Sequence, residues 1–273
     1  MIKKISILGG GNIGKAIALG LLRTGLHNPE SIIVTRRNLP LLNDLAEKGI
    51  ITTSDNRFAV ENADLIIIAV RPRQVEDLLK EVGNYIKSET HILASVIPSY
   101  NIDTIAGLVD KSVSVIRVMP NLAISVNESM TCLAANTDEH EKLEEVQSVF
   151  NQMGKTVIID EQLMPAATVL GACGIAFFLR TIRAISQGGI QIGFHAKEAQ
   201  LIAAQTSKGA SALLIDSKSH PEKEIDKVTT PRGITIAGLN EMDHRGLNSA
   251  LIKGIMTSFN EICNSDSSNN INS

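Results

Sequence analysis

The sequence predicts an α/β protein: a Rossmann-type, doubly wound sheet at the N-terminus, followed by an all-α domain. Over the first 160 residues short apolar runs alternate with helical patterns, as in a parallel sheet with helices on both faces. After residue 160 the patterns are helical only. A glycine cluster also follows the first apolar run directly. These observations predict domains at 1–160 and 161–263, with a polar tail at 264–273 that we expect to be disordered.

Apolar runs of the first half predict the strands. The run at 63–70 (ADLIIIAV) is apolar almost throughout, which is typical of a strand buried on both faces of a parallel sheet. The predicted strands cover residues 4–8, 32–35, 63–70, 92–96, 114–118, 130–134 and 157–159. Apolar residues at helical spacing predict helices between them at residues 12–23, 39–48, 74–85 and 138–153.

The second half predicts helices at residues 162–187, 196–215, 221–228 and 247–262. The stretches 176–185 and 247–262 are more apolar than one small helical domain needs for its own core. An excess of this kind is buried when subunits associate, so we expect a homo-oligomer, either a dimer or a ring of dimers.

Composition excludes several classes of function. The chain has 273 residues and a formal net charge of −3, so there is no basic excess to neutralise a nucleic acid. No apolar stretch is expected to reach the length of a bilayer span, which predicts no membrane partner. The three cysteines, at 132, 173 and 263, lack the spacing of metal ligands, so no metal site is predicted. A reduced, cytoplasmic protein fits this cysteine usage.

The glycine cluster has the pattern Gly9-x-Gly11-x-x-Gly14, after a predicted strand and at the start of a predicted helix. This context is that of a dinucleotide-binding turn. The first glycine permits the tight turn, the second lets the backbone approach the pyrophosphate, and the third lets helix and strand pack closely. Amides at the helix N-terminus then receive the phosphate charge.

The end of the second strand indicates which nicotinamide cofactor is bound. An NAD site places an Asp or Glu there to accept from the ribose 2′-hydroxyl. This chain has Thr35, Arg36 and Arg37 instead, with no carboxylate until Asp44. Two guanidiniums and a hydroxyl suit a 2′-phosphate, so we expect NADPH to be preferred over NADH.

The apolar run at 63–70 ends in Ala69, Val70, Arg71 and Pro72. The carboxyl ends of strands face the cofactor in doubly wound sheets, which places these four residues at the cofactor. An ordinary strand-end cation is the equally good alternative interpretation of Arg71.

Residues 226–239 (DKVTTPRGITIAGL) resemble the signature of pyrroline-5-carboxylate reductases, with its Ser/Thr-Pro-Gly-Gly-x-Thr core. Further motifs extend the resemblance, in the same order, over nearly the whole chain: 54–56 (SDN), 69–72 (AVRP), 117–121 (RVMPN) and 203–209 (AAQTSKG). The resemblance implies a Rossmann domain and a helical domain that interlocks two subunits. It also implies NAD(P)H-dependent reduction of the cyclic imine pyrroline-5-carboxylate, a small molecule, to proline. The chain departs from the family pattern at Leu122, Ala123, Ile175 and Arg232.

Glycine pattern, strand ends and resemblance together define the expected site. The cofactor-binding residues expected are Leu8, Gly9, Gly10, Gly11, Asn12, Ile13, Gly14, Thr35, Arg36, Arg37, Asn56, Ala69, Val70, Arg71, Pro72, Ser95, Met119, Pro120 and Asn121. The substrate-binding residues expected are Thr230, Gly233, Ile234 and Thr235. Thr235 is the expected catalytic residue, because its hydroxyl can hydrogen-bond the imine nitrogen. Its alternative role is that of a helix N-cap without chemical function.

Two other functions stay open at this point. One is a different Rossmann reductase, acting on other imines or on β-hydroxyacids. The β-hydroxyacid dehydrogenases use a lysine in their catalytic helix, whereas the corresponding residues 166–180 of this chain contain no lysine. The other is a non-catalytic, dinucleotide-binding regulatory protein of the same fold, which would bind NADPH without turning over the imine.

Overall fold

The computed structural model describes residues 2–136 and 139–269, with side chains described up to residue 264. The chain forms two compact units: residues up to Cys173 together with those from Phe259 onward, and Gly174–Ser258. The units divide at residue 173, later than the boundary predicted at 160, because Met164 is buried with Met119 and Cys132 of the sheet. The division into sequence domains 1–160 and 161–263 stays a prediction.

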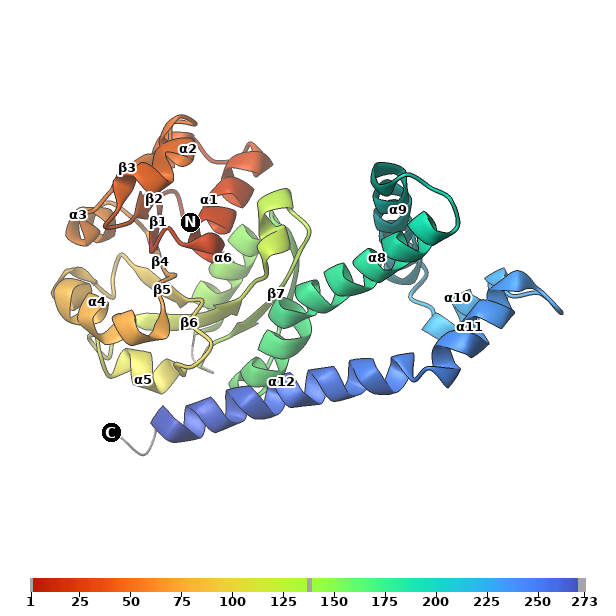
Figure 1. Ribbon diagram of the computed structural model, residues 1–273. Coiled ribbons are helices and arrows are strands. Elements are labelled where there is room, and N and C mark those ends of the chain that lie inside the picture. The colour runs from red at the N-terminus through yellow and green to blue at the C-terminus, as the bar shows by residue number, and fades with distance from the viewer. Residues whose placement is uncertain (1, 137–138, 270–273) are drawn as a thin grey trace. The chain divides into compact units, whose positions relative to one another are not determined.

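The first unit contains a sheet of eight strands in the order β3-β2-β1-β4-β5-β6-β7-β8 (Figure 1). All neighbouring strands are parallel except β6 and β7, which are antiparallel. The strands are β1 (Ile5–Leu8), β2 (Ile32–Thr35), β3 (Ile51–Thr53), β4 (Leu65–Ile68), β5 (Ile92–Ser95), β6 (Ser114–Met119), β7 (Ser129–Ala134) and β8 (Gly154–Ile158). The predicted doubly wound fold is therefore confirmed, and each predicted strand is present within a few residues.

Helices cover both faces of this sheet (Figure 1). The α-helices of the first unit are α1 (Asn12–Thr24), α2 (Asn43–Ala46), α3 (Asn56–Glu61), α4 (Val75–Val82), α5 (Ile102–Ala106), α6 (His140–Asn151) and α7 (Met164–Ala167). Shorter 3-10 helices precede or follow several of them, at Pro29–Ser31, Leu39–Leu42, Pro72–Gln74, Gly83–Tyr85, Leu122–Val126 and Glu161–Leu163. The single helices predicted at 39–48 and 74–85 are each interrupted in this way.

The core lies in two apolar layers, one on each face of the sheet. On β4, Leu65 and Ile67 point into the layer under α1 and α6. Ile66 and Ile68 point into the layer under α3, α4 and α5. Since successive side chains of a strand face opposite sides, a strand buried on both faces must be apolar at every position. This requirement explains the unbroken apolar run that predicted β4.

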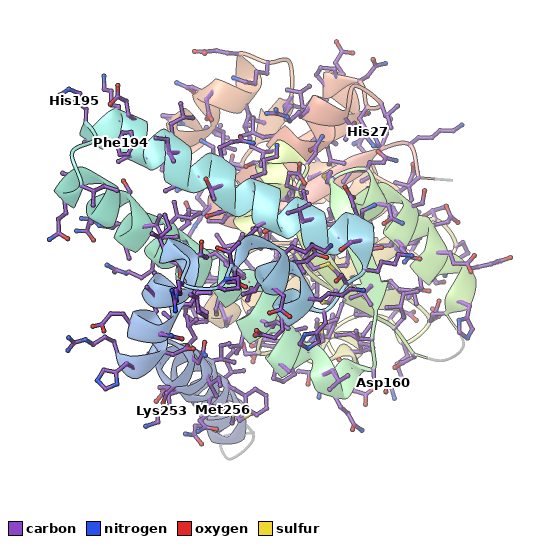
Figure 2. All side chains as sticks on the ribbon, turned by 90° about the vertical axis from the view of Figure 1, so that its right-hand side faces the viewer. His27, Asp160, Phe194, His195, Lys253 and Met256 are labelled. Atoms are coloured by element: carbon purple, nitrogen blue, oxygen red, sulfur yellow. The ribbon has the colours of Figure 1, made fainter. Side chains whose placement is uncertain are left out.

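The second unit is helical, with α8 (Gly174–Gln191), α9 (Ala196–Ser217), α10 (Pro221–Val228), α11 (Ile234–His244) and the start of α12 (Leu247–Asn269). Helices α8 and α9 pack side by side, and Gly189 lets them approach, because a β-carbon there would lie 3.1 Å from that of Ala199. His195 precedes α9 as its N-cap, and its backbone amide donates to the Glu198 carboxylate at 3.3 Å (Figure 2).

Helix α12 continues through Asn269, so the predicted tail at 264–273 begins as helix. Each residue added to an existing helix gains a backbone hydrogen bond, so a helix can extend into polar sequence. Residues 270–273 lie outside the described part of the chain, and for them the tail stays a prediction.

The expectation that no apolar segment reaches the length of a bilayer span is wrong. The structure joins Glu161–Gln191 into 31 continuous helical residues, long and apolar enough to cross a membrane by length and composition. Residues 162–179 contain no charged side chain. A π-helix at Thr168–Cys173 connects α7 with α8 without a break, which turns two moderate apolar stretches into one long one.

His91 gives the first unit a titratable group in its core. Its side chain is buried, and its Nδ1 accepts a hydrogen bond from the backbone amide of Lys87 at 2.9 Å. Burial lowers the pKa of His91 below its usual 6.5, against the opposing effect of the Asp64 carboxylate. The folded state therefore resists protonation of this imidazole more than the unfolded chain does.

We predict that this histidine makes folding stability depend on pH below 6.5. In that range the unfolded chain binds a proton that the folded chain resists, so stability is complete above pH 6.5 and falls as the pH drops. His91→Asn keeps an acceptor for Lys87 but cannot titrate. Urea unfolding at pH 7.5 and 5.5 should show a smaller loss of stability for the variant than for the parent. Equal losses would mean that His91 does not carry this dependence.

Candidate functional site

The predicted cofactor residues meet at one edge of the sheet. Strands β1, β2, β4, β5 and β6 are parallel, so their carboxyl ends lie at the same edge. Strand β1 pairs with β2 on one side and with β4 on the other, so the order of the strands reverses its direction at β1. Doubly wound folds bind ligands at such a switch point, at the carboxyl ends of the strands. The segments brought to this edge are 8–14, 35–37, 69–72, Ser95 and 119–121.

The glycine-rich turn is shaped by close backbone approaches. Gly9 has φ +117°, and a β-carbon there would lie 2.6 Å from the carbonyl oxygen of Ala69. A β-carbon on Gly14 would overlap the Gly9 carbonyl oxygen. These two positions therefore need glycine for the fold itself, because α1 starts directly against the ends of β1 and β4.

Gly11 differs from its neighbours because a β-carbon there would meet nothing within 4 Å. It is the N-cap of α1, and it provides no side-chain hydrogen bond to the first turn of that helix. The first turn of α1 thus has no side-chain cap and has open space beside its N-cap, as an incoming pyrophosphate requires. This cradle fits a dinucleotide.

At the end of β2, Arg36 folds back onto the glycine-rich turn. Its Nη1 donates to the carbonyl oxygen of Gly10, and its backbone amide donates to Thr53 O at 3.0 Å. Arg36 is half-buried and Arg37 is exposed. The Arg36 guanidinium therefore lies beside the turn, at the end of β2, and Arg37 follows it in the chain.

The other predicted cofactor residues already have partners. Asn56, at the start of α3, donates from Nδ2 to both carboxylate oxygens of Glu81 at 3.2 Å. Asn121 is buried, and its side chain donates to Gly171 O at 3.2 Å and accepts from Ala123 N at 3.0 Å. Ser95 Oγ accepts from Ile97 N at 3.3 Å. The Arg71 side chain is exposed, which leaves both interpretations of it open.

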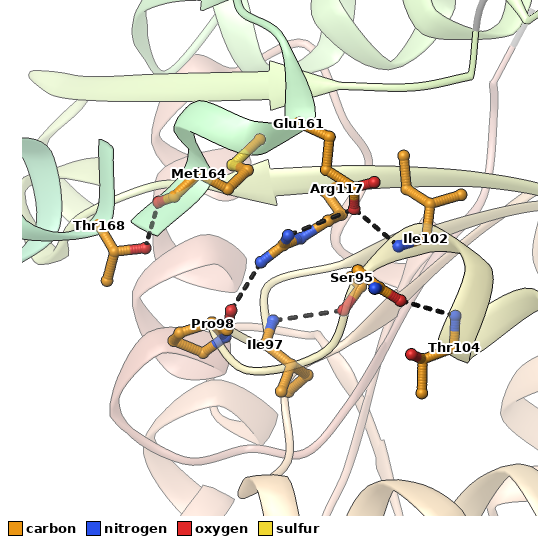
Figure 3. Close-up of polar contacts among 10 residues, drawn as sticks. Ser95, Ile97, Pro98, Ile102, Thr104, Arg117, Glu161, Met164 and Thr168 are labelled. Carbon is orange, nitrogen blue, oxygen red and sulfur yellow. Dashed lines mark hydrogen bonds and ion pairs between the residues drawn. The ribbon is translucent and has the colours of Figure 1, made fainter. Parts of the chain in front are cut away.

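A buried ion pair next to this edge was missed by the sequence reasoning (Figure 3). Arg117 of β6 donates to Pro98 O at 2.6 Å and pairs with Glu161 Oε1 at 3.3 Å. The same carboxylate oxygen accepts from the backbone amide of Ile102 at 2.7 Å. The cluster fixes the chain between β5 and α5. An arginine inside the apolar run of β6 was the signal that could have indicated it, because a buried charge needs a partner.

The substrate residues expected from the resemblance lie on a tight turn of the second unit. Gly233 N donates to Thr230 O at 2.8 Å, with Pro231 at the second position and Arg232 at φ +59° at the third. This is a type II turn, in which the third position usually carries glycine. The departure at Arg232 is therefore a left-handed arginine, and its side chain is exposed.

Thr235 lies in the first turn of α11 and is exposed. The N-cap of α11 is Gly233, so the alternative role of Thr235 as an N-cap is wrong. Gly233 offers no side-chain cap, so its side chain does not occupy the first amides of α11, where an anion could bind. The turn and the first residues of α11 thus bring Thr230, Gly233, Ile234 and Thr235 together.

No group of three or more His, Cys, Asp or Glu side chains that could hold a metal ion occurs in residues 2–136 and 139–264. Burial raises the pKa of the Cys132 thiol, which keeps it protonated.

Comparison with known proteins matches each part of the chain to a protein family. Residues 4–99 match a family described as coenzyme F420-dependent NADP oxidoreductases. Residues 161–263 match the family of pyrroline-5-carboxylate reductase dimerisation domains. Fold and site thus define a dinucleotide-binding oxidoreductase with a Rossmann domain.

The relatives identify the family more closely. Over 94% of its length the chain is 43% identical to pyrroline-5-carboxylate reductase 2 of Dictyostelium discoideum, covering 91% of that protein. It is 45% identical over 93% of its length to pyrroline-5-carboxylate reductase 1 of the same organism, but spans only 48% of that longer protein. The chain belongs to the pyrroline-5-carboxylate reductase family.

Solved structures agree with this family. A pyrroline-5-carboxylate reductase from Coxiella burnetii superposes with a TM-score of 0.85 at 26% identity, covering 96% of this chain and 98% of that one. The Plasmodium falciparum enzyme with NADP bound has a TM-score of 0.81 at 22% identity, covering 97% of each chain, and so shows the shared fold.

Two glycine substitutions should separate folding from cofactor binding. Gly11→Ala fills space that the protein leaves empty, so we predict an unchanged melting temperature and NADPH affinity lower by about ten-fold or more. Gly14→Ala should destabilise the protein by about 1–3 kcal/mol, because its methyl group meets the Gly9 carbonyl. Thermal unfolding and fluorescence titration with NADPH measure both. Undiminished NADPH binding by Gly11→Ala would contradict a pyrophosphate at this position.

Proposed function

We propose that this chain reduces 1-pyrroline-5-carboxylate to L-proline with NADPH, the last step of proline biosynthesis. The observation that carries the proposal is the 43% identity to a pyrroline-5-carboxylate reductase over nearly the full length of both chains. The glycine-rich turn and the turn before α11 support it, since each presents uncapped helix amides to an anion.

When bound, the reduced nicotinamide supplies the hydride to the imine carbon. The chain's own residues then have two tasks. The amides of Gly233 to Thr235 hold the substrate carboxylate, and the Thr235 hydroxyl hydrogen-bonds the ring nitrogen, which gains a proton as the C=N bond is reduced. The imine nitrogen is itself basic, so a strongly perturbed acid is not needed, and orientation supplies most of the acceleration.

We further propose that NADPH is preferred over NADH. Arg36 and Arg37 follow β2, where a site for an unphosphorylated ribose carries a carboxylate. A guanidinium can bind a phosphate through two parallel hydrogen bonds.

The assembly we propose is a homodimer or a ring of dimers, in the cytoplasm. The second unit exposes large apolar side chains on its helices and in the turn between α8 and α9, including Phe178 at 70%, Ile192 at 78% and Leu201 at 70% (Phe194 and Met256 are labelled in Figure 2). A subunit interface buries such side chains, and we assign the apolar segment Glu161–Gln191 to it rather than to a bilayer. The cysteine usage of the sequence, three cysteines without the spacing of metal ligands, fits a reducing compartment.

The deciding experiment follows NADPH oxidation with pyrroline-5-carboxylate, a panel of other cyclic imines and several 2-oxo acids. Turnover of pyrroline-5-carboxylate above the others supports the proposal. Faster turnover of another substrate would favour a different reductase of this fold, and NADPH binding without any turnover would favour a non-catalytic regulatory protein.

Arg36→Asp tests the cofactor preference. The substitution replaces attraction to the 2′-phosphate by repulsion, so the Kd for NADPH should rise by about ten- to a hundred-fold. The Kd for NADH should change much less. Arg23→Asp makes the same change of charge at the other end of α1 and should leave both affinities unchanged. Equal losses of NADPH and NADH affinity would reject the assignment of Arg36.

Thr235→Val tests the substrate residue. The variant keeps the shape but loses one hydrogen bond to the ring, so kcat/KM for the imine should fall by about 5- to 150-fold, or about 1–3 kcal/mol. NADPH affinity and melting temperature should stay the same. Thr229→Val is the matched control, because the Thr229 hydroxyl donates to Asp226 O at the end of α10. If Thr235→Val reduces the imine as fast as the parent, Thr235 is not the substrate residue.

A further inference from the structure

The segment from the end of β2 into the first turn of α2, residues 36–44, carries the arginines of the proposed NADPH site. Most of it is exposed, and only Leu42 is buried. An exposed segment keeps a defined position only where contacts tie it to the rest of the fold. The contacts of this segment therefore decide where its two arginines lie when an adenosine binds.

Two of these contacts reach the glycine-rich turn. Arg36 donates to Gly10 O, as described above. The Leu42 side chain packs over Gly10, where a β-carbon would lie 2.6 Å from Leu42 Cδ2. The segment thus lies against the turn at both of its ends.

The third contact comes from Lys15, the residue directly after the last glycine of the pattern. Its Nζ donates to Leu41 O at 3.1 Å and pairs with the Asp44 carboxylate at 2.6 Å. Lys15 is about three-quarters buried, with 27% of its side chain exposed, while Asp44 is 48% exposed. The hydrogen bond from Lys15 lowers the pKa of Asp44, so the carboxylate is ionised and its charge is matched by Lys15.

Asp44 is the first carboxylate of the chain after β2. In dinucleotide folds the carboxylate that accepts from the ribose hydroxyls lies at the end of the second strand, whereas Asp44 lies further along the chain, in α2. An unpaired carboxylate on the same segment as the arginines would lower the positive potential that a phosphate meets there. The charge of Lys15 offsets that of Asp44.

We propose that Lys15 is a specificity-determining residue: by occupying the Asp44 carboxylate, it keeps the segment after β2 selective for an adenosine that carries a 2′-phosphate. The inference rests on the proposed preference for NADPH. It concerns the adenosine end of the cofactor and not the imine.

The test measures binding of two probes that differ only in this phosphate, adenosine 2′,5′-bisphosphate and adenosine 5′-monophosphate, by calorimetry at low salt. The selectivity is the ratio of their dissociation constants. Lys15→Met should lower this ratio by about five-fold, the contribution of one partly exposed charge, with little change for the monophosphate. Lys15→Met combined with Asp44→Asn should recover most of the parent's ratio, because the unpaired carboxylate is then gone.

Lys48→Met is the matched control. Lys48 donates to the backbone oxygen of Asp44 at 3.1 Å and carries the same charge, but its variant leaves the Lys15–Asp44 pair intact. It should keep the parent's ratio. An unchanged ratio in Lys15→Met, an equal loss for both probes, an equal drop in Lys48→Met, or no recovery in the double variant would each overturn the role of Lys15. A parent protein without preference for the bisphosphate would overturn the proposed NADPH preference as well, and this is measured before any variant.

Discussion

The proposed cofactor site, at the carboxyl ends of the parallel strands, depends on close packing between backbone segments at the start of α1. Gly9 lies against the Ala69 carbonyl, and Gly14 lies against the Gly9 carbonyl, so α1 begins where β1 and β4 end. Only this close start brings the first amides of α1 to the switch point of the sheet. The same turn then receives Leu42 and Arg36 from the next connection. A side chain at Gly9 or Gly14 would therefore displace the phosphate cradle and the adenosine side together.

The charge that this edge of the sheet presents depends on which charged side chains are paired, as well as on which residue types are present. Arginines alone do not make a site for a phosphate if an acid of the same segment is free to bind them. Here Asp44 is paired with Lys15 across two helices, and on the far side of the sheet Arg117 is paired with Glu161. Each pair offsets a charge and at the same time fixes a connecting segment: residues 39–44 in one case, the chain after β5 in the other.

Strands buried on both faces, such as β4, could be predicted because burial requires an unbroken apolar run. Short elements could not: β3 (Ile51–Thr53) contains two threonines, and α3 and α5 are shorter than two turns. The ion pair of Arg117 with Glu161 was missed because its partners are 44 positions apart and only the folded chain joins them. The glycine-rich turn was predictable, since its chemistry lies within one local stretch, whereas the link from Lys15 to Asp44 depends on how two helices meet.

The sparse core of the helical half has a thermodynamic consequence. Within residues 174–258 the buried apolar side chains are Ala199 and Ala203, which is far less than an independent helical domain needs. When a partner supplies the missing apolar cover, folding of this half is linked to association by mass action. Its free energy of unfolding is then a function of protomer concentration and not a fixed property of the chain, so dilution acts on it as a denaturant would.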